Sequence, residues 1–159
     1  DYEFKASGSE YILDSKPIFF FSQDLRSLSV KHIVSLYKTG ERKPVYQNMI
    51  EVLEGNVEGD PVKYWLDAEE QTLKETTYKL YKTSLQIAVA DIKGKLVSDD
   101  EKQKSYRIQH GDRKRFERGT HLHSACDQSI IRNLRGWIIA FHQQNDDALC
   151  PTSEDSFLL

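Results

Sequence analysis

Apolar residues recur at spacings of three and four along much of the chain, which is the period of an amphipathic helix. The first such segment starts at Ser22 and stops before Gly40, and a second follows Pro44 and stops at Gly55. Glycine is common just after a helix and proline in its first turn, so the pattern predicts a helix in each segment. The run PIFFF at 17–21 is too short to assign by its period, and we expect one of its phenylalanines in the core.

The segment GDPVKYWLDAEEQ at 59–71 carries the signals of a helix start. Asp60 can accept hydrogen bonds from the free N–H groups of a first helical turn, and Pro61 suits the first position because proline has no N–H group to leave unpaired. Apolar residues then continue at helical spacing to Gly94. One helix of that length would be about three times the mean length, so we expect two helices joined at residues 75–77.

The clearest helical pattern lies near the C-terminus, where apolar residues follow the spacing i, i+1, i+4, i+7, i+8, i+11. Its members are Ile130, Ile131, Leu134, Trp137, Ile138 and Phe141. Burial of each such side chain contributes roughly 1.5–3 kcal/mol, so the pattern predicts a main helix of the core. Gly136 within it indicates a close helix crossing.

Together these patterns predict an all-α fold, a compact bundle of four to six helices in a single domain over 1–159. Residues 97–119 have few apolar side chains and are expected to form a long charged loop. Residues 1–16 and 146–159 are expected to be poorly ordered.

The composition is that of a polar globular protein, with 38% apolar and 30% charged residues among 159. A net charge of −3 is too small to predict a nucleic-acid or membrane partner from the field of the whole chain. No apolar run approaches the ~18 residues of a membrane span, and no signal peptide is evident, so we expect an intracellular, cytoplasmic protein. Two cysteines, Cys126 and Cys150, are too few for a disulfide scaffold; two reduced thiols are favoured and a single bridge stays open.

The segment GTHLHSACDQ contains four residue types that bind metals, at His121, His123, Cys126 and Asp127. On an extended segment the two histidines would point the same way, as in many metal sites. No second, well-spaced pair of ligands accompanies them, and a helix N-terminus with exposed histidines is the favoured alternative. We therefore expect no metal and no cofactor, and the absence of a phosphate loop or a hydrolase or metalloprotease motif favours a non-enzymatic protein.

The segment 102–118 is locally basic and includes two aromatic residues, Tyr106 and Phe116. Its candidate anion-binding residues are Arg107, Arg113, Lys114, Arg115 and Arg118. Such a segment can bind phosphate groups of nucleic acid or of anionic lipid, which makes a helical domain binding either of them the alternative function. A solvated charged loop with no ligand has the same composition.

The segment DPVKYWLDAEE also resembles the signature helix of the regulator-of-G-protein-signalling homology domain, in which an aromatic–Trp–Leu run is followed by an acid. The preceding HIVSLYKTGERKPVYQNMIEVLEGN and the following LKETTYKLYKTSL are similar to the neighbouring helices of that family, so the resemblance covers about 25–92.

This resemblance implies a non-enzymatic protein-interaction or regulatory scaffold module with a protein partner. Active members of the family carry an asparagine where this chain has Pro61, so normal acceleration of GTP hydrolysis is not expected. The family geometry would place the partner-binding surface near Asp60, Pro61, Lys63 and Asp67.

Overall fold

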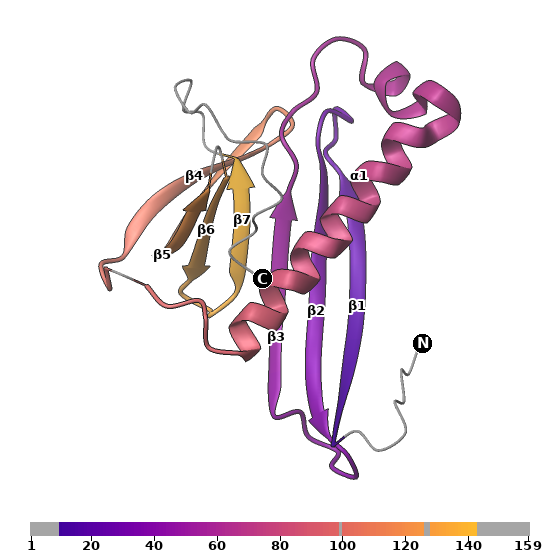
Figure 1. Cartoon of the computed structure of the whole chain (residues 1–159). Helices are drawn as coiled ribbons and strands as arrows, with labels where there is room; N and C mark the ends of the chain where they lie inside the picture. The colour runs from indigo at the N-terminus through magenta and orange to yellow at the C-terminus, as the bar shows by residue number, and fades with distance from the viewer. Residues whose placement is uncertain (1–9, 99, 126–127, 143–159) are drawn as a thin grey trace.

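A seven-stranded mixed β-sheet with one helix against it makes up the described part of the chain (Figure 1). The computed structural model describes residues 10–98, 100–125 and 128–142. The elements in chain order are β1 (Tyr11–Phe21), β2 (Leu28–Lys38), β3 (Tyr46–Leu53), α1 (Pro61–Ile92), β4 (Lys104–His110), β5 (Arg113–Ala125), β6 (Gln128–Asn133) and β7 (Ile138–His142). The strand order is β1-β2-β3-β7-β6-β5-β4, and every neighbouring pair is antiparallel except β3 with β7. The long connection through α1 and β4–β6 makes that one parallel pair possible.

The prediction of an all-α bundle is therefore wrong. Both helices predicted between Ser22 and Gly55 are strands, because β2 and β3 occupy most of that range. Residues 28, 30, 32 and 34 are all buried and face α1, so the true period of β2 is two. The alternation of apolar and polar residues is not evident in the sequence, because the polar residue His32 occupies one of the buried positions.

The apolar stripe near the C-terminus belongs to a β-hairpin, β6–β7, instead of a helix. Its apolar residues are adjacent in pairs because each strand is buried on both faces, which removes the alternation expected of a half-buried strand. Gly136 lies in the turn between the strands with φ +84, a conformation that favours glycine, and marks no helix crossing.

The two faces of the sheet have separate apolar cores. The helix-side core includes Val30, Val34, Ile50, Trp65, Leu80, Ile87, Ile130 and Ile138. A second core on the opposite face consists of Leu53, Ile108, Ile131, Ile139 and Phe141, with Tyr106 against it. The sheet curls around this second core, because β4 contacts β7 although two strands separate them.

The helix start expected at Asp60 is confirmed, and the expected end at Gly94 is close to the observed one. Asp60 is the N-cap, Pro61 is the first helical residue, and Gly94 follows the C-cap with φ +70. The joint expected at 75–77 lies instead at residues 67–70, where the backbone leaves the helical conformation. Beyond the joint, α1 runs diagonally across the sheet and packs on β2 and β3 (Figure 1). No described helix combines the length and the hydropathy needed to cross a membrane.

The expected charged loop at 97–119 is replaced over most of its length by the β4–β5 hairpin, with Gly111 (φ +65) in its turn. β1 starts at Tyr11, so the poorly ordered N-terminal segment expected at 1–16 is a strand over its last six residues. Residues 1–9, the tail 146–159 and both cysteines lie outside the described residues.

Of the phenylalanines at 19–21, Phe19 packs against the helix-side core, whereas Phe20 and Phe21 are 42% and 41% exposed. The expectation of one phenylalanine in the core is therefore confirmed by Phe19.

Candidate functional site

The start of α1 is fixed by local hydrogen bonds and by an anchored tryptophan. Asp60 Oδ1 accepts from the backbone N–H groups of Val62 (3.0 Å) and Lys63 (3.4 Å). Trp65 is 3% exposed, and its indole N–H donates to the carbonyl oxygen of Leu25 at 2.7 Å. These contacts hold the first helical turns against the β1–β2 connection.

Arg26 secures the same junction from the other side. Its guanidinium donates to the carbonyl oxygens of Val57 (3.0 Å) and Gly59 (2.9 Å), in the loop that leads into the helix. The loop is therefore tied to the residue next to Leu25, and the helix start has a defined position on the sheet.

Exposed apolar side chains lie beside Trp65 and in the same first turns of α1. Phe21 and Tyr64 contact its ring edge-on, with centroid distances of 5.6 and 4.9 Å. We call this group the Trp65 surface; it consists of Phe21, Leu25, Val62, Tyr64, Trp65 and Leu66, all of which except Trp65 are at least 40% exposed. A group of exposed apolar side chains around a buried aromatic residue commonly marks an interaction site.

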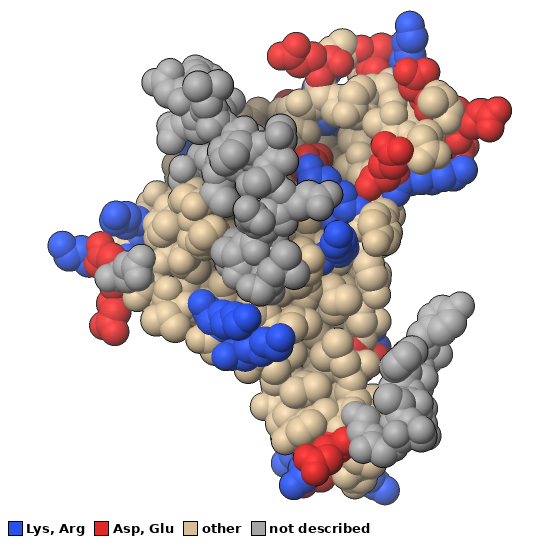
Figure 2. All heavy atoms as spheres, in the orientation of Figure 1, with Lys and Arg blue, Asp and Glu red and all other residues tan. Residues whose placement is uncertain are grey.

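The candidate partner-binding residues lie at this end of the molecule. Asp60, Lys63 and Asp67 are exposed, and Pro61 is half-buried. Between residues 58 and 70 there are five acids and one lysine. Figure 2 shows Asp and Glu side chains gathered at the upper right, where Figure 1 places the first turns of α1. The Trp65 surface therefore has an apolar centre and an acidic rim.

A strained joint separates these first turns from the long part of α1. Ala68, Glu69 and Glu70 have φ of 50°, 56° and 66°, in the left-handed region that residues with a Cβ avoid. Each such residue costs roughly 1–2 kcal/mol, a cost that contacts elsewhere in the fold must offset.

The basic residues of the candidate anion site are divided between two faces of the β4–β5 hairpin. On the inner face, Arg115 forms a bidentate ion pair with Glu51 of β3, and Arg113 donates to the side-chain oxygen of Gln23 at 2.6 Å. Burial opposes the charge of Arg115, but Glu51 holds its pKa above the usual value. These contacts show that Arg113 and Arg115 link β5 to other parts of the fold.

The other three, Arg107, Lys114 and Arg118, share the opposite, solvent-facing side of the hairpin. Phe116 lies directly opposite Arg107 in the ladder, and Lys114 and Arg118 are two residues to either side of it on β5. All four side chains are exposed. In a strand, successive side chains of the sequence KRFER point to opposite faces, which gives this division of the basic residues. The division could be predicted only if the segment were known to be a strand.

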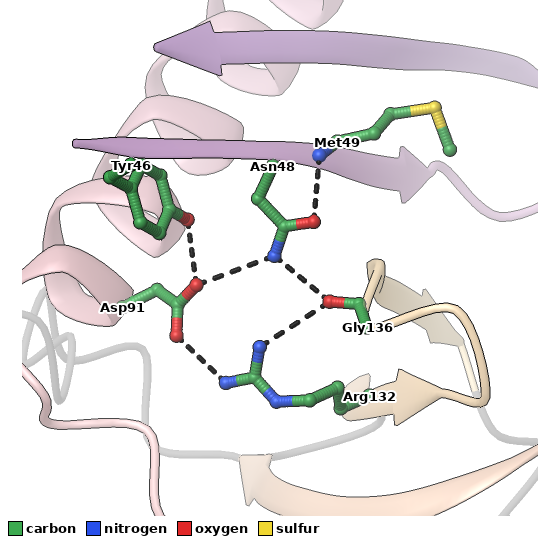
Figure 3. Close-up of polar contacts among 6 residues, drawn as sticks. All are labelled: Tyr46, Asn48, Met49, Asp91, Arg132 and Gly136. Atoms are coloured by element: carbon green, nitrogen blue, oxygen red, sulfur yellow. Dashed lines mark hydrogen bonds and ion pairs between the residues drawn. The ribbon is translucent and has the colours of Figure 1, made fainter. Parts of the chain in front are cut away.

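A polar cluster fastens the C-terminal part of α1 to the sheet (Figure 3). Asp91 accepts from the hydroxyl of Tyr46 (2.6 Å), from Arg132 (2.7 Å) and from the amide of Asn48 (3.4 Å). Asn48 and Arg132 also donate to the carbonyl oxygen of Gly136, at 2.9 and 3.4 Å. The carboxylate of Asp91 thus joins α1 to β3 and β6, and Asn48 and Arg132 extend the cluster to the β6–β7 turn.

The ionisation of this cluster follows from its contacts. Burial opposes the charge on Asp91, yet the hydrogen bonds from Arg132 and Tyr46 hold the pKa of that carboxyl below its usual value. Burial and the neighbouring carboxylate raise the pKa of Tyr46. Asp91 therefore stays ionised and Tyr46 stays protonated, which suits a structural clamp.

A second buried polar cluster surrounds His32, which is 0% exposed. The Ser84 hydroxyl donates to the carbonyl oxygen of Tyr81 (2.9 Å), so it can only accept from His32 Nδ1, at 2.8 Å. His32 Nε2 is then an acceptor for the Ser15 hydroxyl. The imidazole is neutral with both nitrogens paired, and the ring of Tyr81 stacks on it at 5.4 Å.

Stability is expected to fall as the pH drops from about 6.5 to about 4, because burial lowers the pKa of His32 to about 4. Over that range the unfolded chain binds the proton that the folded protein excludes, which costs up to about 3 kcal/mol. Urea unfolding of the wild type and of His32→Gln at a series of pH values measures the slope of the free energy of unfolding against pH. The variant, which keeps the other histidines, should show the smaller slope; equal slopes would contradict a buried neutral His32.

The histidine pair considered for metal binding does not face one way. A β-bulge shifts the register of β5, so His121 pairs with Ile131 and His123 with Ile130, which face opposite sides of β6. His121 Nε2 is instead 2.6 Å from the Ser124 hydroxyl. Within the described ranges, no three His, Cys, Asp or Glu side chains gather as metal ligands; Cys126 and Asp127 lie outside those ranges.

The residues expected to bind a partner, Asp60, Pro61, Lys63 and Asp67, lie at the start of α1 near Trp65, and their role in binding stays a prediction. The sequence did not indicate the apolar side chains beside them. Phe21 and Leu25 are far from Trp65 along the chain, and only the contact between the β1–β2 connection and α1 brings them together. The helical arrangement implied for 25–92 by the regulator-of-G-protein-signalling resemblance is also absent, since β2 and β3 replace its first helices. Comparison with protein-family models, curated proteins and solved structures found no match.

Proposed function

We propose that this chain is a non-enzymatic protein-interaction module that acts as a regulator or scaffold and docks a basic, apolar segment of a partner protein on the Trp65 surface. The observation that carries the proposal is the group of exposed apolar side chains around an anchored tryptophan. Solvent exposure of five such side chains at one end of the molecule is unfavourable unless a partner covers them.

The make-up of the surface supports a protein as the occupant. Binding energy at protein interfaces is concentrated in a few aromatic residues at the centre, surrounded by a polar rim that excludes water. Here Phe21, Tyr64 and Trp65 form the centre, and Asp60, Lys63 and Asp67 lie around it. The anchored tryptophan also reduces the conformational entropy that a partner would otherwise have to remove.

The charge of the rim selects the partner. Five acids against one lysine between residues 58 and 70 attract cations and repel nucleic acid and anionic membranes. A partner segment with lysine or arginine next to large apolar side chains would satisfy both parts of the surface, and its charges would mainly raise the rate of association.

Selection from a random peptide library displayed on phage tests the proposal, with counter-selection against the Leu66→Glu variant. We expect the recovered peptides to combine Lys or Arg with Leu, Phe or Trp. Their affinity should fall about tenfold or more for Tyr64→Ala, because truncation of a central aromatic side chain has the largest effect at an interface. Charge reversal by Glu58→Lys should slow their association.

Two matched variants control for the mutations themselves. Tyr78→Ala removes an even more exposed tyrosine farther along α1, and Glu41→Lys reverses an exposed acid between β2 and β3; neither should change peptide binding. Recovery of no basic peptide, or of peptides that bind Leu66→Glu as well as wild type, would overturn the proposal. If the wild type sedimented as a dimer and Leu66→Glu as a monomer, the occupant of the Trp65 surface would be a second copy of this chain instead of another protein.

A further inference from the structure

We infer that the solvent-facing side of the β4–β5 hairpin is a second binding surface, and that its ligand is single-stranded nucleic acid. The surface consists of Arg107, Lys114, Phe116 and Arg118, and it continues into a pocket at the β6–β7 turn. It is separate from the Trp65 surface and does not depend on the function proposed for that surface.

The side-chain alternation of the two strands concentrates positive charge on this side. Positions 105, 107 and 109 of β4 and positions 114, 116, 118 and 120 of β5 share the face, and they include three basic residues and no acid. The arginines of the inner face, Arg113 and Arg115, are bonded to Gln23 and to Glu51. Of the five basic residues considered for anion binding, Arg107, Lys114 and Arg118 therefore point to solvent together and can contact one ligand.

Phe116 gives the surface a preference for bases as well as phosphates. Its side chain is 72% exposed, although it occupies the middle of a strand. Lys114 and Arg118 lie about 7 Å from it on either side along β5, and Arg107 is opposite on β4. A row of cation, ring and cation matches the alternation of phosphate and base in a single strand, whose bases stack on aromatic rings while lysine and arginine contact the backbone.

The pocket extends this row beyond Arg118. It has a volume of about 280 Å³ and is lined by Glu117, Arg118, Asn133, Leu134, Arg135 and Trp137. The guanidinium of Arg135 lies over the Trp137 ring, 4.9 Å from its centroid. Asn133 Oδ1 accepts from the backbone N–H groups of Arg135 and Trp137, both at 3.0 Å, so the turn that carries this pair is held in shape. An arginine stacked on an aromatic ring beside a pocket suits a nucleobase.

A single strand fits this surface better than a duplex or a membrane. In a duplex the bases are stacked inside and cannot reach Phe116. An anionic membrane would also attract the cations, but its headgroups offer no base to stack on the exposed ring of Phe116. The acidic rim of the Trp65 surface keeps the nucleic acid at the hairpin.

Fluorescence anisotropy of labelled 12-nucleotide RNA and DNA of mixed sequence tests the inference, with the 12-base-pair duplex and with vesicles containing phosphatidylserine as comparisons. We expect binding to the single strands at 50 mM salt, weaker binding to the duplex, and a slope of log affinity against log salt of roughly −2 for three phosphate contacts.

The variants separate stacking from charge. Phe116→Ala should weaken binding about fivefold or more without changing the salt slope, because stacking releases no counterions. Lys114→Gln and Arg118→Gln should each reduce the slope by roughly 0.7. Phe20→Ala and Lys43→Gln, which remove an exposed phenylalanine and an exposed lysine elsewhere, should change neither quantity.

Each contrary result overturns the inference. No binding of either single strand at 50 mM salt, equal affinity for the duplex, or an unchanged affinity for Phe116→Ala would do so. Binding to vesicles that is lost in Phe116→Ala, without binding to the oligonucleotides, would assign the surface to anionic lipid instead.

Discussion

Arg115→Met is expected to lower the free energy of unfolding by about 3 kcal/mol at neutral pH. The carboxylate of Glu51 is only 5% exposed on the inner face of the sheet, and Arg115 is its bidentate partner. Removal of the arginine leaves the buried carboxylate without its bidentate partner, which is among the most destabilising kinds of single change in a protein. Urea unfolding followed by circular dichroism measures the loss.

The reciprocal variant should be less harmful. The Arg115 side chain is 40% exposed, so water can solvate its guanidinium after Glu51→Met, and we expect a loss of about 1–2 kcal/mol. The double variant should be more stable than Arg115→Met, because it carries no unpaired buried charge. If Glu51→Met proved the more destabilising change, the placement of Glu51 inside the curled sheet would be wrong.

Gly119→Ala is expected to cost about 3 kcal/mol and to disturb the β5–β6 pairing. A Cβ at this position would overlap the carbonyl oxygen of Arg132, and it would lie 2.9 Å from the carbonyl carbon of that residue and 3.0 Å from the Cα of Asn133. These are backbone atoms of β6, which cannot rotate away, so the strands must separate. Thermal unfolding of the variant gives the loss of stability directly.

Gly55→Ala is the matched control for this substitution. A Cβ at Gly55 meets only the ring of His142 at 3.7 Å, an ordinary contact, and the residue has no left-handed φ. It should change stability by less than about 1 kcal/mol. Similar stabilities for the two variants would show that β5 and β6 do not approach as closely as the register Gly119↔Asn133 requires.

Local signals in the sequence were sufficient at the two ends of α1, although similar signals at Gly40, Pro44 and Gly55 did not mark helices. The start of α1 is set by Asp60 and Pro61, which act on N–H groups within the same turn, and its end is close to Gly94. Both boundaries follow from hydrogen bonding and backbone freedom within a few residues, so they can be predicted without knowledge of the fold.

The joint in α1 could not be predicted in the same way. Ala68, Glu69 and Glu70 are good helix formers, and nothing in their side chains favours a left-handed backbone. The turns before the joint are anchored by a contact distant in the sequence, since the indole of Trp65 donates to the carbonyl oxygen of Leu25 forty residues earlier in the chain.

The strands were misread because burial on both faces removes the two-residue alternation. Ile130 and Ile131 are both buried, one in each core, and the same holds for Ile138 and Ile139. Adjacent apolar pairs separated by a polar turn then imitate the spacing of an amphipathic helix. All four of these residues are isoleucines, and the preference of β-branched side chains for strands was the remaining signal.

The sequence by itself determined the helix start at Asp60, the helical segment that follows it and the local charge of the two candidate surfaces. Only the tertiary structure decided that the rest is a sheet, that Phe21 and Leu25 lie beside Trp65, and that Arg115 faces inward while Phe116 faces outward. Helix caps act between residues close in the chain, whereas strand pairing and the face that a strand buries depend on residues far away in it.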